Sequence, residues 1–370
     1  MRDACADPQR RRAWLQLALA PGLSPRAARR ALLEAGGPEA ALARPLGWWR
    51  ALGRAGRELA LEVHPAHTEP EPALRRIAEL GARALTPEEA DWPHAAFQGL
   101  HEPPCALFVR GTWPTEGRVA VALVGTRAAT PYGLRVAREL GEGLARRGVV
   151  IVSGLALGID AAAHAGALAS GAEAPRTVAV LGCGLAVPYP PENATLRDEV
   201  ALAGALVSEH APDVPPERWH FPRRNRIVAA LARAVVVVEA PLRSGALITA
   251  GFAVEQGREV LAVPGPIGRF THEGGHRLLK EQSASLCRGV DDVLLALGLA
   301  AAGESPRAVT LPAPGPQLAL WRLLSEDEAL DADGLCRASA LPASEVAAAL
   351  ASLELDGRVV RVPGVGYLRR

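Results

Sequence analysis

The residues whose types could do the most chemistry form one short run. Residues 220–226 read His-Phe-Pro-Arg-Arg-Asn-Arg and stand before an apolar segment, residues 234–239, that predicts a buried strand. The spacing of apolar residues predicts a helix over residues 227–233 between the two. Arginines at the start of a helix join its free N–H groups in attracting an anion, and guanidinium is the preferred partner of a phosphate. A phenyl ring beside them can stack a nucleic-acid base. The alternative, a solvated arginine-rich loop, is disfavoured because the run adjoins core.

The composition bounds the class of protein. The chain has 370 residues, enough for two or three domains, and a net charge of +1, so any surface for a polyanion must be local. Its five cysteines are scattered without a Cys-x-x-Cys pair, which argues against a disulfide framework or a zinc site and indicates a reducing cytosol. No apolar run is long enough to span a membrane. We therefore expect a cytoplasmic protein that does not insert into membranes and holds no metal or other cofactor.

The middle of the chain alternates apolar segments with helical patterns. The predicted strands are residues 107–109, 119–124, 149–152, 177–181, 205–208, 235–239 and 260–263. Helical patterns of ten or more residues separate most of them. Short, nearly all-apolar strands alternating with helices are typical of an α/β fold with a doubly wound parallel sheet covered on both faces.

A helical region precedes this sheet. Over residues 10–65 a Pro-Gly-Leu turn leads into Ser24 and Pro25, which fit the N-cap and first position of a second helix. The region therefore has helix-hairpin-helix character. Its turn amides could hold a phosphate, but the same spacing is also ordinary packing in a small helical domain, and both interpretations stay open.

A second small domain follows the sheet. Residues 303–316 are rich in Pro, Gly and Ala and predict a linker. Beyond it come three helical patterns and two strand patterns, the order of a winged helix: residues 318–324, 331–339, 344–356, 358–362 and 367–370. The third helix carries acids and few donors for bases, which favours protein contacts over DNA reading. We expect a helical domain over 1–75, an α/β domain over 80–300, a linker over 301–316 and a winged helix over 317–370.

Two loops at strand ends carry residues suited to phosphate. In a doubly wound sheet, ligands bind where strands end and helices begin. After the strand at 119–124, glycine lets the backbone approach a phosphate, threonines donate hydroxyls and arginine adds charge, from Gly125, Thr126, Arg127 and Thr130. The next loop holds Gly154 and Gly158, followed by Asp160 and His164. Asp160 fits a helix N-cap with His164 one turn later on the same face, so the two either contact ligand or satisfy each other.

Two further strand ends are less specific. Gly182 and Gly184 suggest a dinucleotide loop, but Val187 stands where the third glycine belongs. Ser244 and Gly245 would open a helix whose free amides make another seat for an anion. No catalytic set is evident, because the serines lack a base and neither paired carboxylates nor a Walker lysine is present. The loops therefore predict a site that holds phosphates and does not break bonds.

These loops, in this order, resemble the DNA-processing protein A family (DprA, also called Smf). The resemblance covers about residues 80–295. Its motifs are Val124-Gly125-Thr126-Arg127, Ser153-Gly154-Leu155-Ala156 with Gly158-Ile159-Asp160 and His164, Tyr189-Pro190, Ser208-Glu209, Phe221-Pro222-x-Arg224-Asn225-Arg226, Glu239, Ser244-Gly245 with Thr249-Ala250, Gly257-Arg258 and Val263-Pro264-Gly265.

The resemblance implies a fold, a function and partners. It implies an extended Rossmann-like domain that binds and protects incoming single-stranded DNA, forms a homodimer and loads the RecA recombinase during natural transformation. The flanking domains resemble the helical, SAM-like and winged-helix domains of longer family members. Single-strand-binding protein is a further expected partner.

The resemblance also implies roles for residues. Arg127 stands as the principal phosphate contact, with Arg224 and Arg226 lining the same pocket and Phe221 nearby. The expected nucleic-acid site comprises Gly125, Thr126, Arg127, Thr130, Gly154, Gly158, Phe221, Arg223, Arg224, Asn225, Arg226, Ser244 and Gly245. The family often places a lysine near the Tyr-Pro segment, which this chain lacks. Arg197, Arg223 or the basic N-terminal hairpin would compensate.

Two other functions stay open as alternatives. The first is a nucleotide-binding enzyme of the nucleoside monophosphate hydrolase type, because the segment from Ser244 to Thr249 faintly resembles the phosphate loop of such enzymes. Glu239 or Asp160 would then be the acid or base. The second is a scaffold that acts through the winged helix, which leaves the strand-end loops without a purpose.

Overall fold

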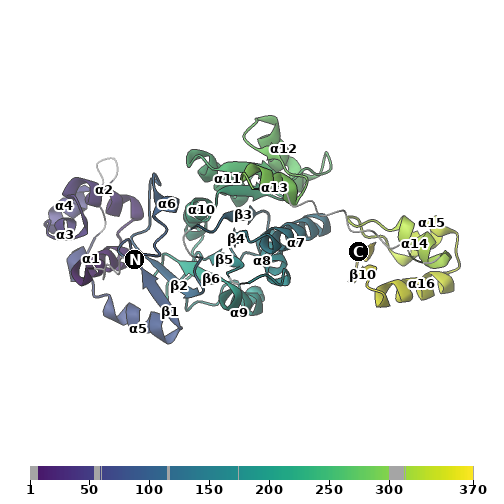
Figure 1. Cartoon of the computed structure of the whole chain (residues 1–370), viewed down its shortest axis with the longest axis horizontal. Coiled ribbons are helices and arrows are strands. Elements are labelled where there is room, and N and C mark those ends of the chain that lie inside the picture. The colour runs from purple at the N-terminus through teal and green to yellow at the C-terminus, as the bar shows by residue number, and fades with distance from the viewer. Residues whose placement is uncertain are drawn as a thin grey trace. The chain divides into compact units, whose positions relative to one another are not determined.

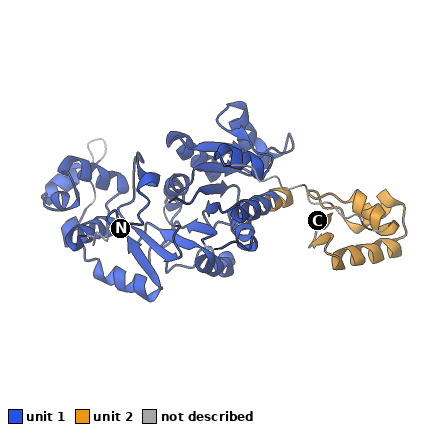
Figure 2. Ribbon diagram, in the orientation of Figure 1, with its two compact units in different colours: residues 1–128, 136–300 blue, residues 129–135, 301–370 orange. Residues whose placement is uncertain are grey.

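The computed structural model describes residues 7–53, 59, 61–114, 117–173, 175–299, 312 and 314–369. The chain divides into two compact units, residues 1–128 with 136–300 and residues 129–135 with 301–370 (Figure 2). The larger unit therefore contains both the N-terminal helices and the α/β sheet. The finer division at residues 75–80 stays a prediction.

One sheet organises the larger unit. Within the described residues it has nine strands in the order β1-β2-β6-β5-β4-β3-β7-β8-β9. They are β1 (Ala82–Leu85), β2 (Leu107–Gly111), β3 (Ala120–Val124), β4 (Val150–Ser153), β5 (Thr177–Val180), β6 (Ala205–Ser208), β7 (Ala234–Val237), β8 (Glu259–Ala262) and β9 (Ser285–Leu286). From β6 across to β9 all neighbours pair in parallel. This confirms the predicted α/β fold.

The sheet differs from the prediction at its edges. β2 is antiparallel to both of its neighbours, β1 and β6, so the expectation that every strand is parallel is wrong there. A short apolar segment carries no signal of strand direction, which is set by the path of the chain between strands. β1 and β9 were not predicted. β9 has two residues, both exposed, and gives no apolar pattern to recognise.

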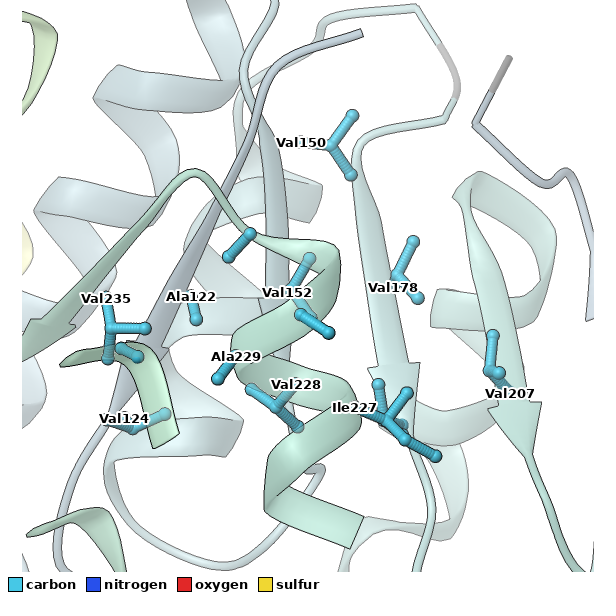
Figure 3. Packing of buried hydrophobic residues seen from close by; sticks show 14 of the residues in the cluster. Ala122, Val124, Val150, Val152, Val178, Val207, Ile227, Val228, Ala229 and Val235 are labelled. Atoms are coloured by element: carbon cyan, nitrogen blue, oxygen red, sulfur yellow. The ribbon is translucent and has the colours of Figure 1, made fainter. Parts of the chain in front are cut away.

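Helices follow most of the parallel strands and cover the sheet (Figure 1). They are α7 (Pro131–Arg146), α8 (Ile159–Ala169), α9 (Ala194–Ala203), α10 (His220–Leu231), α11 (Gly245–Glu255), α12 (Glu273–Lys280) and α13 (Val290–Ala296). The apolar side of α10 packs on the sheet, where Ile227 and Val228 are buried among Val152, Val178 and Val207 (Figure 3).

The helix predicted over residues 227–233 begins earlier, at His220. Its arginines therefore lie within the first two turns and do not precede the helix. Pro222 is compatible with this start, because residues in the first turn of a helix have no N–H partner to lose. Because these arginines are helical, the residue at which α10 begins sets the direction of each arginine side chain and so which of them can reach a ligand.

The N-terminal helices form the expected hairpin. α1 (Pro8–Leu19) and α2 (Pro25–Ala35) are joined by a short turn, and the Ser24 hydroxyl accepts from the Ala27 N–H at 3.2 Å as the N-cap of α2. α3 (Pro38–Leu42) and α4 (Leu46–Ala51) complete this region around the buried Trp49. α5 (Glu71–Glu79) leads into β1, and α6 (His94–Phe97) precedes β2.

The smaller unit contains a winged-helix arrangement, as predicted. Residues 314–369 form three helices, α14 (Pro316–Leu323), α15 (Ala332–Ser339) and α16 (Ala343–Leu355), then the hairpin of β10 (Val359–Val362) and β11 (Gly366–Arg369). Leu320, Leu335 and Leu353 lie in its core. Across the described parts of both units, no helix has the length and apolarity that crossing a membrane requires.

Candidate nucleic-acid interface

A crevice of about 720 Å³ lies where β3, β4 and β7 end and where α10 begins. Most of the predicted site residues line it: Gly125, Thr126, Arg127, Gly154, Phe221, Arg224, Asn225, Ser244 and Gly245. The others, Thr130, Gly158, Arg223 and Arg226, do not. The loops after separate strands therefore meet at one place, as doubly wound sheets require of a ligand site.

Arg127 is one of the exposed cations of the crevice. It is exposed, and its guanidinium lies over the Phe221 ring, 5.2 Å from the centroid. No carboxylate of the described residues lies within salt-bridge distance of it. The backbone that precedes it is held at Thr126, whose N–H donates to the Glu239 carbonyl at 2.7 Å and whose carbonyl accepts from the Ile159 N–H at 3.2 Å. A positioned cation beside an aromatic face can take a phosphate and its base together.

Phe221 is held by its neighbours and still lines the crevice. Its ring centroid lies 5.6 Å from that of Tyr189. A Cβ on Gly182 would come within 2.8 Å of the Phe221 ring, so this glycine is required by the ring and not by a dinucleotide. Phe270, 66% exposed, also lines the crevice and was missed by sequence reasoning. Its signal was an aromatic residue shortly after the Val-Pro-Gly motif.

The glycines of the second loop have internal causes. Gly158 has φ +78°, and a Cβ there would lie 2.4 Å from the Thr126 carbonyl oxygen and 2.6 Å from that of Arg127. A Cβ on Gly154 would lie 2.3 Å from the guanidinium of Arg224. These glycines let their backbone pack closely against the neighbouring loop and against the Arg224 side chain. Their contact with nucleic acid stays a prediction.

Arg224 lines the crevice, but its charge is already engaged. It is buried and donates to the carbonyl oxygens of Gly154, at 2.8 Å, and Val180. Burial lowers the pKa of Arg224, and the nearby Asp160 carboxylate opposes this shift. Burial likewise raises the pKa of Asp160, against the attraction of Arg224. Arg224 is thus a fixed donor within the wall of the crevice.

The expected roles of Asp160 and His164 need correction. The N-cap of α8 is Gly158, and the Asp160 carboxylate instead accepts from the N–H groups of Gly154 at 3.1 Å and Ala156 at 3.4 Å. His164 does not pair with Asp160. Its Nδ1 lies 2.7 Å from the Thr177 hydroxyl, and burial lowers the pKa of His164 to about 3. Asp160 therefore holds the loop before α8, and His164 joins α8 to β5.

Arg226 does not share the pocket of Arg127, contrary to expectation. It is buried, and its two terminal nitrogens lie 2.7 and 2.6 Å from the two carboxylate oxygens of Glu209, while its Nε donates to the Glu102 carbonyl at 2.8 Å. Burial raises and Arg226 lowers the pKa of Glu209, and the net shift is downward. Arg197, one of the three expected substitutes for the family lysine, is also buried, with its guanidinium bound to the Leu185 and Val187 carbonyls.

Of the remaining predicted residues, Ser244 and Asn225 line the crevice and Thr130 lies outside it. Ser244 is the N-cap of α11, as predicted, with its hydroxyl 3.2 Å from the Ala246 nitrogen. The Asn225 amide donates to the Gly245 carbonyl at 3.2 Å and so joins α10 to this turn. The Thr130 hydroxyl accepts from the Gly133 N–H at 3.2 Å, at the start of α7.

The charges of the crevice suit an anion. The exposed Arg218 and Arg243 line it in addition to Arg127, and sequence reasoning did not select them. Among the described residues that line the crevice, Asp160 is the one acid. Glu239 does not line it, because its buried carboxylate accepts from the Thr271 hydroxyl at 3.2 Å and lies 3.2 Å from His272 Nε2.

A Rossmann-like sheet with an arginine-rich, aromatic crevice at its carboxyl edge is an arrangement in which α/β proteins bind anionic ligands, including nucleic acids. Comparison with known proteins agrees. The family model described as DNA recombination-mediator protein A matches residues 83–298, and that of the DprA winged helix domain matches residues 304–365. The chain therefore belongs to the DprA/Smf family of DNA-processing proteins.

Individual relatives support this assignment. The chain is 41% identical over 299 residues to Protein Smf of Escherichia coli K12, which covers 77% of each chain. The crystal structure of DNA processing protein A from Streptococcus pneumoniae matches with a TM-score of 0.62 and 31% identity, over 76% of this chain and 95% of that one. A structure of the Helicobacter pylori protein, described by its single-stranded DNA binding mode, matches with a TM-score of 0.51 and 30% identity, over 58% of this chain and 95% of that one.

Proposed function

We propose that this protein binds single-stranded DNA in the crevice, protects it, and loads a RecA recombinase onto it during natural transformation. The observation that carries the proposal is the exposed Arg127 guanidinium over the Phe221 ring, without a carboxylate partner among the described residues. A phosphate can take the guanidinium while a base stacks on an aromatic ring. The single-stranded DNA binding described for the Helicobacter pylori relative supports the same ligand here.

The crevice favours binding over chemistry. The carboxylates that an enzyme would use are engaged, Glu239 by Thr271 and His272 and Asp160 by backbone N–H groups. Phosphate contacts and stacking do not read base identity, so we expect sequence-tolerant binding. Because each phosphate contact releases counterions, the affinity should also fall with salt.

Membership of the family supports a proposal for the assembly around this site. We propose a homodimer through the Rossmann-like domain, residues 80–300, which would present two crevices to one strand. The SAM-like region over residues 1–75 and the winged helix over 317–370 would contact partners, which include RecA and single-strand-binding protein. The acidic third helix of the winged domain is consistent with protein contacts, since Glu345 and Glu354 are exposed on α16.

The test combines binding with loading. Fluorescence anisotropy of labelled oligo-dT should give an affinity that falls about tenfold or more as salt rises from about 50 to about 200 mM. On DNA coated with single-strand-binding protein, the chain should then shorten the lag of DNA-dependent ATP hydrolysis by RecA. A salt-independent affinity contradicts the DNA site. An unchanged lag contradicts loading alone.

An enzymatic role has its own readout. A panel of nucleoside monophosphates incubated with the protein should release no free base. Release that is lost in Glu239→Gln would overturn the proposal and favour the hydrolase alternative.

A further inference from the structure

A large aromatic residue stands just outside the crevice, at the N-cap of α10. Trp219 is 52% exposed, whereas the other six tryptophans of the chain are buried or half-buried. Arg218, the preceding residue, lines the crevice. The exposed indole is therefore adjacent in sequence to the proposed DNA site without belonging to it.

The indole is fixed by its neighbours. Its ring N–H donates to the Glu217 carboxylate, and the His220 ring meets it edge-on with centroids 4.0 Å apart. The Arg223 guanidinium lies 5.4 Å from the ring centroid. A ring that is already immobilised loses little conformational freedom on stacking a base, and a cation beside it is placed for the adjoining phosphate.

The charge of Arg223 is available. No carboxylate of the described residues lies within salt-bridge distance of its guanidinium, whereas Arg226 on the next turn of the helix is paired with Glu209. The carboxylate nearest the indole, Glu217, is hydrogen-bonded to the ring N–H. Arg223 thus repeats beside Trp219 the arrangement that Arg127 has over Phe221.

A second cavity extends this pair toward the N-terminal hairpin. Trp219 and Arg223 line a cavity of about 130 Å³ together with Leu23, from the turn between α1 and α2, and Pro25, the first residue of α2. His210 lines it too, and its buried Nε2 has no hydrogen-bond partner among the described residues. The consecutive residues Arg218 and Trp219 therefore line the crevice and this cavity respectively.

We propose that Trp219 and Arg223 form a second contact for single-stranded DNA, the α10 platform. It stacks a base of the strand that leaves the crevice, binds the neighbouring phosphate and directs the strand toward Leu23 and Pro25, where α2 begins. This inference rests on the proposed function, because the platform extends the path of a strand that the crevice already holds.

The test compares a short and a long strand. Labelled oligo-dT of about 6 nucleotides fills the crevice, and one of about 20 nucleotides also reaches the platform. Trp219→Ala and Arg223→Ala should leave the affinity for the short strand within about twofold and weaken the long strand by at least about fivefold. Trp219→Phe keeps a ring and should retain most of the affinity. The matched control is Trp48→Phe on α4, where Arg44 lies 5.6 Å from the indole centroid, outside the crevice and the cavity.

Intrinsic fluorescence gives an independent readout. The long strand should quench the tryptophan emission of the wild type and of Trp48→Phe, and the quenching should be lost in Trp219→Phe although this variant still binds. If the wild type binds both strands and Trp219→Ala binds them equally well, the platform is wrong and the crevice stands. Equal weakening of both strands by Trp219→Ala also overturns the platform. If the wild type binds neither strand, the proposed function itself fails.

Discussion

The exposed arginines of the crevice and the buried arginines behind it have the same charge and different partners. Arg127 and Arg243 are exposed at strand ends, with no carboxylate of the described residues in salt-bridge distance. Arg224 and Arg226 lie on α10, where one binds carbonyl oxygens and the other binds Glu209. The first group can bind a ligand, and the second holds the wall that positions it.

This difference teaches how to assign arginines in such a site. A buried guanidinium needs a partner within the protein, because leaving either charge unpaired is expensive. A guanidinium that remains without one must find its partner in solvent or in a ligand. Substitution in the two groups should therefore change different properties, stability in one and affinity in the other.

The largest effect is expected in the buried pair. Glu209→Ala leaves the Arg226 charge buried and should lower the free energy of unfolding by about 3–5 kcal/mol, measured by urea denaturation. The double variant Glu209→Ala with Arg226→Met removes both charges and should recover much of this loss. A nearly neutral Glu209→Ala would mean that Arg226 finds another partner, and the distinction between the two groups would weaken.

Acid pH should lower the free energy of unfolding, because the buried His164 resists protonation in the folded protein. Its folded pKa of about 3 lies below the value near 6.5 in the unfolded chain, so between these limits only the unfolded chain binds the proton. This contribution to stability is complete above about pH 6.5 and falls by roughly 1.4 kcal/mol per pH unit below it. His164→Gln should flatten the pH dependence of the free energy of unfolding. Parallel curves for the two proteins would contradict this assignment.

Gly158 connects the exposed arginines to the buried wall behind them, because its backbone packs against the carbonyl groups of Thr126 and Arg127. Gly158→Ala should lower stability by about 1–3 kcal/mol and also weaken DNA binding, because the added Cβ pushes the backbone that carries Arg127. Gly171 is the matched control, since it also has a positive φ, +69°, but no atom within 4 Å of an added Cβ. Gly171→Ala should show the conformational strain alone. Equal effects of the two substitutions on DNA affinity would contradict the link.

The smallest effect is expected at the cap of α11. Ser244→Ala removes the hydrogen bond to the Ala246 nitrogen and should cost about 1 kcal/mol of stability. If the Ser244 hydroxyl also contacts DNA, the affinity at low salt should fall in the same variant. Thermal unfolding and oligo-dT binding of one preparation distinguish a cap from a ligand contact.

The fold was largely predictable because its signals are local. The interior strands are short apolar runs, and caps such as Ser24 and Ser244 are read from neighbouring residues. The direction of β2 and the existence of β9 were not predictable, since neither leaves a pattern in its own few residues. Both depend on where distant parts of the chain return.

The site was predictable as a set of loops but not as a set of contacts. The sequence placed three arginines within residues 223–226 and could not separate their roles, because the partners lie far along the chain. Arg224 meets Gly154, and Arg226 meets Glu209 and Glu102. Arg218 and Arg243 flank segments that were predicted for the site, but nothing in the sequence shows which flanking side chains reach the crevice, and Phe270 reaches it from a loop that was not selected.

The most direct test of the account is the salt dependence of oligo-dT affinity for the wild type, Arg127→Ala and the control Arg75→Ala, an exposed arginine on α5 outside the crevice. Arg127→Ala should weaken binding about tenfold or more at low salt and reduce the slope of log affinity against log salt by about 0.7, the share of one phosphate contact. Arg75→Ala should match the wild type, and all three proteins should unfold at the same temperature. Wild-type affinity and slope in Arg127→Ala would contradict the claim that the exposed arginine of the crevice holds the DNA.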